Sequence, residues 1–316
     1  MIVDLPGTTT SQVSKTLVTL REEGGAVALG RVLTLVIATN GGEEEAAIEA
    51  ANEASREHPM RVIVLAPAGG EDDAPRLDAE VRIGGDAGAS EVVVLRPRGA
   101  AGSNEESLVT GLLLPDAPVV VWWTGAAPEV VASSSLGRIA TRRITDASEA
   151  GDARAALRHL SRSYTPGDTD FAWTRLTLWR AQLAAVLDQP PYETIEAVDV
   201  AGAGDSPSTL LLAAWLSLRL DVPVHYDLTR SIGSVGIRSV RLHRASGVIE
   251  LEREAPHDAR LTQPGQPPQD VSLPRRTLTE CLAEELRRLD PDDTYGEVLR
   301  IGLDLLEHEN DGADVP

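Results

Sequence analysis

The chain has 316 residues, of which 42% are hydrophobic and 25% are charged, a composition typical of a folded globular protein and not of a disordered one. Its 29 Lys and Arg against 49 Asp and Glu give a formal net charge of −20, which disfavours binding to nucleic acid or to an anionic membrane surface. Because a single hydrophobic core usually stops growing before this length, we expect two domains, residues 1–165 and 166–316.

Scarce residue types narrow the chemistry further. Lys15 is the only lysine, and no glycine-rich loop precedes it, so neither a Schiff-base lysine nor a phosphate-loop lysine is expected. Cys281 is the only cysteine, so no disulfide forms within the chain and a reducing compartment is indicated. The longest apolar runs fall short of the roughly 20 residues of a membrane span, and the N-terminus does not resemble a secretory signal. We therefore expect a cytoplasmic protein without membrane segments.

Helices alternate with apolar strands along the first domain. The spacing of apolar residues predicts helices over residues 8–23, 43–57, 105–113 and 151–162. Strands are predicted over residues 31–39, 61–66, 91–95 and 118–123. These strands are apolar without alternation, which is typical of a largely parallel sheet covered on both faces. The first domain is therefore predicted to be a three-layer α/β unit.

The second domain repeats the alternation and then changes. Asp170 is expected to cap a long helix that runs to residue 187. A strand at 195–200, a helix at 206–220 and a strand at 222–226 are predicted next. They are followed by an antiparallel hairpin or meander at 236–252, a Pro- and Gln-rich surface connection at 255–274, and helices at 277–289 and 295–308. The fold class is thus α/β in both domains, with largely parallel or mixed sheets flanked by helices, and the tail after residue 309 should fray.

A glycine-rich turn joins the strand at 195–200 to the helix at 206–220. Gly202, Gly204, Ser206 and Ser208 belong to it, and such a turn can present backbone N–H groups to a phosphate. Pro207 stands where a dinucleotide fingerprint has its third glycine, and a proline after a serine cap is also ordinary chemistry for a helix start. Three interpretations stay open: a plain strand-to-helix turn, an anion or phosphosugar site, and a dinucleotide site.

The residues that carry most enzyme chemistry form no recognisable constellation. The turn does not complete the Gly-x-Ser-x-Gly pattern of a hydrolase. No two of the six histidines have the spacing of a zinc site; they are His58, His159, His225, His243, His257 and His308. We therefore predict no catalytic residues, no metal site and no cofactor.

Two groups of residues are candidates for partner binding. Arg138, Arg142 and Arg143 form the densest basic group in the first domain, and guanidinium groups bind phosphates or a partner's carboxylates well. Ion pairs with the chain's own acids are the alternative. Trp122 and Trp123 are adjacent in a predicted strand, so their rings point to opposite faces and one of them can reach a pocket or an interface. The alternative is that both tryptophans lie in the hydrophobic core.

Several segments resemble the glucose-6-phosphate dehydrogenase assembly proteins, the OpcA family. The most distinctive are PVVVWW at residues 118–123 and WTRLTLWR at residues 173–180. Weaker matches lie at residues 30–36, 58–64, 112–117, 171–172 and 206–208, and the overall length also agrees.

The resemblance implies a cytosolic, non-catalytic factor that binds glucose-6-phosphate dehydrogenase, promotes its active oligomer and so supports NADPH supply through the oxidative pentose phosphate pathway. The family has been connected with thioredoxin control, but the single Cys281 excludes an internal disulfide switch and leaves only an intermolecular one. It offers no catalytic residues to carry over. The alternative is an enzyme or sensor that binds a phosphorylated sugar or nucleotide at residues 202–208, which predicts an arginine-lined pocket there.

Overall fold

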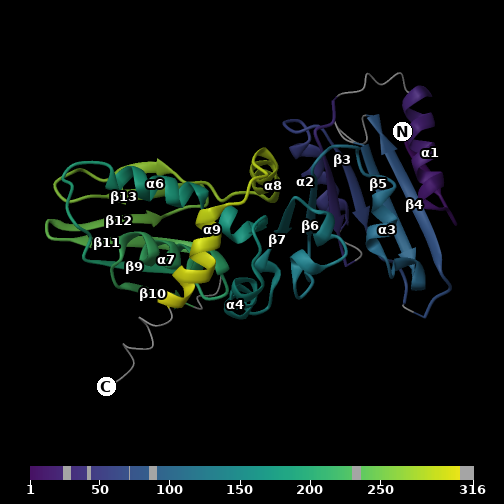
Figure 1. The fold of residues 1–316 in the computed structure, drawn as a ribbon. Helices are drawn as coiled ribbons and strands as arrows, with labels where there is room; N and C mark the ends of the chain where they lie inside the picture. The colour runs from purple at the N-terminus through teal and green to yellow at the C-terminus, as the bar shows by residue number, and fades with distance from the viewer. Residues whose placement is uncertain (24–29, 41–43, 71, 85–90, 230–235, 307–316) are drawn as a thin grey trace. The chain divides into compact units, whose positions relative to one another are not determined.

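The computed structural model describes residues 1–316 except 24–29, 41–43, 71, 85–90, 230–235 and 307–316, and it divides into two compact units (Figure 1). The first unit consists of Met1–Asp146, Gly167–Thr169 and Thr277–Pro291. The second consists of Ala147–Pro166, Asp170–Arg276 and Asp292–Pro316. Each contains a mixed sheet flanked by helices, so the predicted fold class is confirmed.

The first unit contains an eight-stranded sheet in the order β1-β4-β5-β3-β2-β6-β7-β8. The strands are β1 Ile2–Leu5, β2 Leu33–Ala38, β3 Met60–Leu65, β4 Arg76–Ile83, β5 Glu91–Arg98, β6 Val119–Trp123, β7 Arg142–Thr145 and β8 Asp168–Asp170. Strands β5, β3, β2, β6 and β7 run parallel, and β4 runs antiparallel to β5 and β1. Taken in chain order, the five parallel strands have the order 3-2-1-4-5 of a doubly wound sheet.

The central strands of this sheet are apolar because they are buried on both faces. Every residue of β3 and of β6 is buried, as expected when helices cover both faces of a parallel sheet. The helices of the first unit are α1 Thr10–Glu23, α2 Glu44–Ala54, α3 Glu105–Thr110 and α8 Leu278–Arg287. Helix α2 buries small apolar residues, and α8 packs against it although more than 200 residues separate the two in sequence.

The predicted strands and helices of the first unit are confirmed, but four strands were missed. Strands β1, β4, β7 and β8 carry charged residues at positions where a buried strand is expected to be apolar. Strand β7 begins with Arg142 and Arg143, whose side chains are buried because acids neutralise them, and sequence periodicity does not reveal such pairing.

A buried carboxylate joins the elements at one end of the first sheet. The Glu91 side chain is 1% exposed and forms ion pairs with Arg21, Arg31 and Arg61. The Arg31 and Arg61 pairs measure 2.6 and 3.0 Å, and Arg61 also donates to the Leu112 carbonyl oxygen at 2.5 Å. One acid at the start of β5 thus holds α1, β3 and the end of the α3 segment.

Replacing this acid tests the ion-pair cluster. We expect Glu91→Gln to lower the free energy of unfolding by about 3 kcal/mol, because it leaves three arginine charges without their common anion. Urea denaturation measures the change. The matched control is Glu106→Gln, whose exposed pair with Arg138 should contribute less than about 1 kcal/mol. Equal stabilities of the two variants would contradict the assigned role of Glu91.

The second unit contains a six-stranded sheet in the order β10-β9-β11-β12-β13-β14. The strands are β9 Ala197–Ala203, β10 Val224–Thr229, β11 Ile237–Arg244, β12 Gly247–Arg253, β13 Asp258–Thr262 and β14 Gln269–Ser272. Strands β9 and β10 run parallel, joined by a helix, and the remaining neighbours run antiparallel. The helices are α4 Ala153–Ser163, α5 Phe171–Thr174, α6 Thr177–Leu187, α7 Pro207–Leu220 and α9 Asp293–Glu297, which continues as a π-helical turn, η6 Val298–Gly302.

Helix α7 forms the centre of this unit. It is apolar on nearly all sides, and most of its residues are buried against β9, β10 and η6. A Cβ at Gly302 would lie 2.7 Å from the Ala214 carbonyl oxygen, so glycine permits the close approach of η6 to α7. Burial on every side is what a helix at the centre of a core requires.

Two predictions for the second unit were wrong. The helix predicted over residues 170–187 is divided at Arg175 and Leu176 into α5 and α6, although Asp170 does cap its start. The connection predicted over 255–274 contains β13 and β14, which extend the predicted hairpin into a four-stranded meander. Strand β14 lies at the edge of the sheet and most of its residues are exposed, so its sequence contains few apolar positions that would predict a strand. The tail after residue 309 lies outside the described residues.

The division in space differs from the predicted cut between residues 165 and 166. Helix α4 belongs to the second unit, where it packs against α7 and η6, and α8 belongs to the first. Helix α8 is held there by a buried ion pair between Glu285 and Arg142 of β7. Composition along the chain does not predict an ion pair between residues so far apart in sequence. Within the described residues, no helix has both the length and the apolar character needed to cross a membrane.

Candidate functional site

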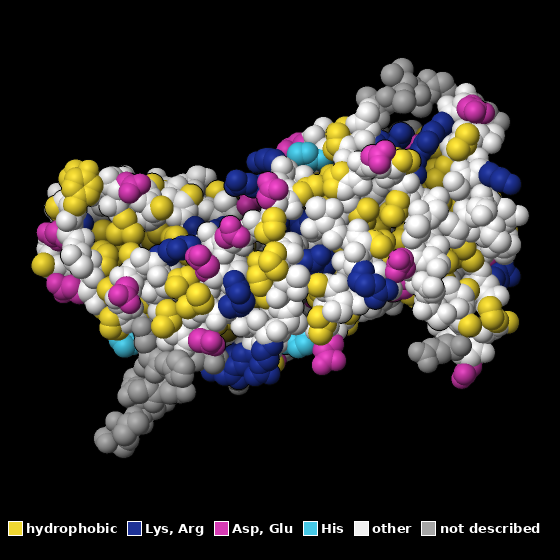
Figure 2. Space-filling model, in the orientation of Figure 1, with side chains coloured by type: hydrophobic (Ala, Val, Ile, Leu, Met, Phe, Trp, Pro, Cys, Tyr) yellow, Lys and Arg dark blue, Asp and Glu magenta, His cyan; other side chains and the backbone are white. Residues whose placement is uncertain are grey.

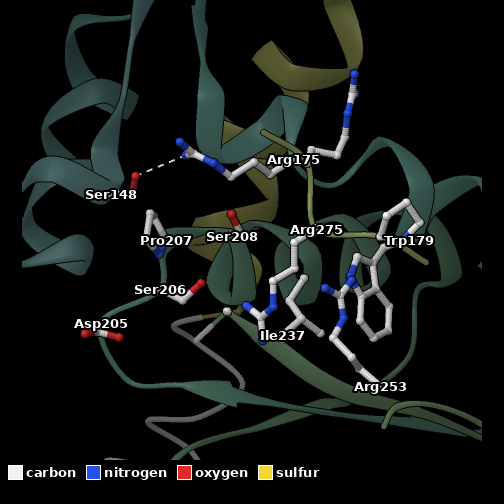
Figure 3. Close-up of a pocket in the computed structure, with 13 residues that line it drawn as sticks. Ser148, Arg175, Trp179, Asp205, Ser206, Pro207, Ser208, Ile237, Arg253 and Arg275 are labelled. Carbon is white, nitrogen blue, oxygen red and sulfur yellow. Dashed lines mark hydrogen bonds between the residues drawn. The ribbon is translucent and has the colours of Figure 1, made fainter. Parts of the chain in front are cut away.

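A cavity of about 370 Å³ lies in the second unit beside the turn that leads from β9 into α7 (Figure 3). Its walls come from the segment before α4, from α5 and α6, from the β9–α7 turn, from β11 and β12, and from the segment before α8. The lining residues are Ser148, Arg175, Trp179, Asp205, Ser206, Pro207, Ser208, Gly236, Ile237, Arg253, Pro274, Arg275 and Arg276.

The turn places the start of a long helix at this cavity. Ser206 is the N-cap residue of α7, and its side chain makes no capping hydrogen bond, so its hydroxyl is not consumed by the helix. Pro207 occupies the first helical turn, where its missing N–H costs nothing. The 14-residue helix directs the positive end of its dipole toward the cavity.

Gly202 serves packing. A Cβ at Gly202 would lie 2.4 Å from Thr209 Oγ1 and 2.9 Å from the Gly236 carbonyl oxygen, so only glycine lets β9 approach α7 this closely. Gly202 belongs to β9 and Gly204 to the turn that follows it. Of the four residues predicted for an anion site, Ser206 and Ser208 line the cavity, whereas Gly202 packs behind it.

Ser208 has a structural contact of its own. Its side-chain oxygen donates to the Ala172 carbonyl oxygen at 2.8 Å and thereby fastens α7 to α5. Helix α5 is in turn capped by Asp170, whose carboxylate accepts from Ala172 N at 2.8 Å and from Ala147 N at about 3 Å. These bonds fix the wall that carries Ser148 relative to the start of α7.

Two of the four lining arginines are held by neutral oxygens. Arg175 donates to Ser148 Oγ at 3.1 Å, and Arg276 donates to the Thr174 carbonyl oxygen at 3.3 Å. A neutral acceptor positions a guanidinium without cancelling its charge. These two contacts place both guanidinium groups in the wall of the cavity.

Arg253 is the most constrained of the four. Its guanidinium carbon lies 5.4 Å from the centroid of the Trp179 ring, and its Nε atom is buried without a hydrogen-bond partner. Burial, followed by the nearby charge of Arg275, lowers the pKa of Arg253 to about 10. Arg253 is still protonated at neutral pH, but its charge is held at a cost that an anion would remove.

The arginine-lined pocket that the alternative function predicts at this turn is present, but the sequence did not identify which arginines line it. Arg175, Arg253 and Arg275 come from three segments that are distant along the chain and meet only when the meander folds against α5 and α7. The adjacent Arg275 and Arg276 were the only local signal available. The denser basic group of Arg138, Arg142 and Arg143 in the first domain was a stronger signal in the sequence.

The tryptophans predicted for partner binding are buried. Trp122 is 2% exposed and Trp123 is 4% exposed, so neither forms an exposed apolar patch in the structure. Trp123 belongs to the cluster that contains Val13 and Leu17 of α1, and Trp122 faces the other side of the sheet, as alternation in a strand requires.

The three arginines predicted for partner binding form ion pairs with the chain's own acids. Arg142 meets Glu285 at 2.5 Å, both side chains being at most 6% exposed, and the buried Arg143 pairs with Asp168. Arg138 is 59% exposed and reaches Glu106 at 3.1 Å. Figure 2 shows acidic and basic side chains interspersed on the visible face, as such pairing implies. Partner binding by these three arginines and by Trp122 and Trp123 stays a prediction.

The corresponding position of the first unit is occupied by acidic residues of the chain itself. Helix α2 follows β2, the first of the doubly wound strands, and its first turn carries Glu44 and Glu45. Glu45 pairs with Arg82 at 2.5 Å, and that hydrogen bond is the main reason that its pKa lies below the usual range. Carboxylates already occupy the positive end of this helix, where a dinucleotide would place its phosphates.

Cys281 lies in α8 and is fully buried. An intermolecular disulfide needs an accessible thiol, so this position is inert unless α8 moves. The predicted absence of a metal site is not contradicted: within the described part of the chain, no group of three or more His, Cys, Asp or Glu side chains is arranged to hold a metal ion.

The fold and the cavity define a protein of two α/β units whose second unit contains an arginine-lined cavity. Models of the glucose-6-phosphate dehydrogenase subunit match it, the N-terminal domain over residues 51–162 and the C-terminal domain over residues 166–299. The chain belongs to this family, the OpcA or glucose-6-phosphate dehydrogenase assembly proteins. No curated protein sequence matches it.

Solved structures with a similar course of the chain are dehydrogenases and reductases. Myo-inositol dehydrogenase from Lactobacillus casei is 11% identical, with 89% of this chain and 95% of that chain covered and a TM-score of 0.47. An oxidoreductase from Sinorhizobium meliloti is 10% identical, with 89% and 98% covered and a TM-score of 0.48. Identities and TM-scores this low carry no argument about the chemistry of this chain.

Substitution of Gly202 tests whether it serves packing. We expect Gly202→Ala to lower the free energy of unfolding by about 2 kcal/mol, because the added methyl group meets the buried Thr209. Urea denaturation without ligand measures the effect. Gly151→Ala, where a Cβ meets nothing within 4 Å, is the control and should leave stability within about 0.5 kcal/mol. A Gly202→Ala variant as stable as the control would show that the close approach is not required.

Proposed function

We propose that this chain is a non-catalytic assembly factor that binds glucose-6-phosphate dehydrogenase and promotes its active oligomer in the cytoplasm, and so supports NADPH supply through the oxidative pentose phosphate pathway. The observation that carries the proposal is the family match, which extends over residues 51–299 and therefore draws on both units. Such a factor acts by binding the active assembly more tightly than the inactive one.

The chemistry of the cavity supports a binding role. General base catalysis needs a group whose pKa lies near the operating pH. The pKa of Arg253, even when lowered to about 10, keeps the side chain protonated at neutral pH. Arginines in this state bind anions and do not abstract protons. A cavity dominated by them is suited to recognition.

Titration of the cognate purified dehydrogenase with this protein tests the proposal. We expect a saturable rise in steady-state rate across glucose 6-phosphate and NADP concentrations, together with a shift toward the larger oligomer in sedimentation velocity. Whether the added protein changes the kcat or the KM of the dehydrogenase identifies which state of the enzyme it favours. A tenfold shift between assemblies requires about 1.4 kcal/mol of differential binding. No change in rate or mass at micromolar excess would refute the assembly role.

Arg138 is the predicted partner residue best placed for contact, since its side chain is 59% exposed. We expect Arg138→Glu to slow association with the dehydrogenase about threefold or more at low salt, because rim charges act mainly on the association rate. The matched control is Arg241→Glu, an exposed arginine that is also paired with one acid. Surface plasmon resonance measures both rates. If the two variants associate at the wild-type rate, Arg138 is not a contact residue.

A further inference from the structure

Four arginines line the cavity of the second unit, and one of them, Arg253, has a buried donor that no contact satisfies. Arg175 and Arg276 are positioned by neutral oxygens, and the buried Nε of Arg253 has no hydrogen-bond partner. No ion pair of Arg253 with an acid is found among the described residues. A buried donor without a partner costs about 1–3 kcal/mol, and an anion bound in the cavity would remove that cost.

The surroundings of this charge specify an anion with a phosphate group. Figure 3 shows the Arg275 side chain extending toward Ser206 at the start of α7, and Arg253 beyond it, beside Trp179. Two guanidinium forks, a serine hydroxyl without a capping bond and the positive end of a 14-residue helix are the elements that bind phosphate. The lowered pKa of Arg253, caused by burial and by Arg275, agrees with a site that an anion would stabilise.

The rest of the cavity specifies what the phosphate is attached to. A volume of about 370 Å³ is at the small end of metabolite sites. Trp179 is 3% exposed and has the Arg253 guanidinium near one face, so little of its ring is available to stack on a nucleobase. The remaining polar lining includes the Asp205 carboxylate and the Ser148 hydroxyl, which suit sugar hydroxyl groups.

We propose that the cavity between the β9–α7 turn and the arginines of residues 175, 253 and 275 binds a phosphorylated sugar, with Arg253, Arg275 and Ser206 at the phosphate and Asp205 at the sugar hydroxyls. The site lies wholly within the second unit and does not rest on the proposed function. A ligand there bridges β12, the segment before α8 and the start of α7, and therefore stabilises the folded second unit.

Thermal unfolding and calorimetric titration of the full chain test this proposal without any dehydrogenase present. The probes are glucose 6-phosphate, inorganic phosphate, AMP and sulfate, each at matched ionic strength. We expect a saturable rise in melting temperature with glucose 6-phosphate and a weaker response to the other three. Arg253→Met should bind glucose 6-phosphate at least about tenfold more weakly, because a charge-assisted contact is lost.

Controls separate loss of the site from loss of the fold. Arg241→Met removes one charge from the neighbouring strand β11, outside the cavity, and should bind as the wild type does. Without ligand, Arg253→Met should melt no lower than the wild type, since it removes a charge that the fold holds at a cost. If that variant fails to fold, Arg275→Met replaces it and should show the same loss of binding.

Three results would overturn the proposal. The first is no saturable response to any phosphate up to about 10 mM, a range that covers weak metabolite binding. The second is an equal response to sulfate and glucose 6-phosphate, which would mean an adventitious ion only. The third is equal affinity in the wild type and Arg253→Met. Tighter binding of AMP than of glucose 6-phosphate would refute the sugar assignment in favour of a nucleotide.

Discussion

The architecture of the second unit depends on the buried carboxylate of Asp170. It accepts hydrogen bonds from the backbone of Ala147 and of Ala172, and so joins the segment before α4 to the start of α5. Ser208 at the start of α7 then bonds to the Ala172 carbonyl oxygen. A charged acceptor with backbone donors is strong and rigid in a region without water. The cavity takes its shape from this arrangement.

Buried ion pairs recur in this acidic chain. In the first unit Glu91 gathers three arginines, and Arg142 holds α8 through Glu285. In each case the desolvated charges are matched by opposite charges and hydrogen bonds, which is the condition under which burial is tolerated. Arg253 departs from this pattern, because the charge that acts on it is that of another arginine, Arg275. That contrast within one molecule is what distinguishes the cavity from the structural ion pairs.

The helices that follow β2 in the first unit and β9 in the second unit differ in the charge of their first turns. Helix α2 of the first unit begins with Glu44 and Glu45, which neutralise the helix end with the chain's own carboxylates. Helix α7 of the second unit begins with Ser206 and Pro207 and has no acid in its first turn. The strand-and-helix pattern is therefore similar in both units, but only the second presents a helix end that an external anion can use.

The sequence by itself determined the class of fold, the central strands, helix α7 and the turn beside the cavity, because apolar periodicity, caps and glycines act over short distances. Only the tertiary structure decided that α8 joins the first unit, that Trp122 and Trp123 are core residues, and that Arg253 and Arg275 face one cavity. Those outcomes depend on partners far apart in the chain, and on charges that become buried only when both partners are in place. Local patterns contain no information about such pairings.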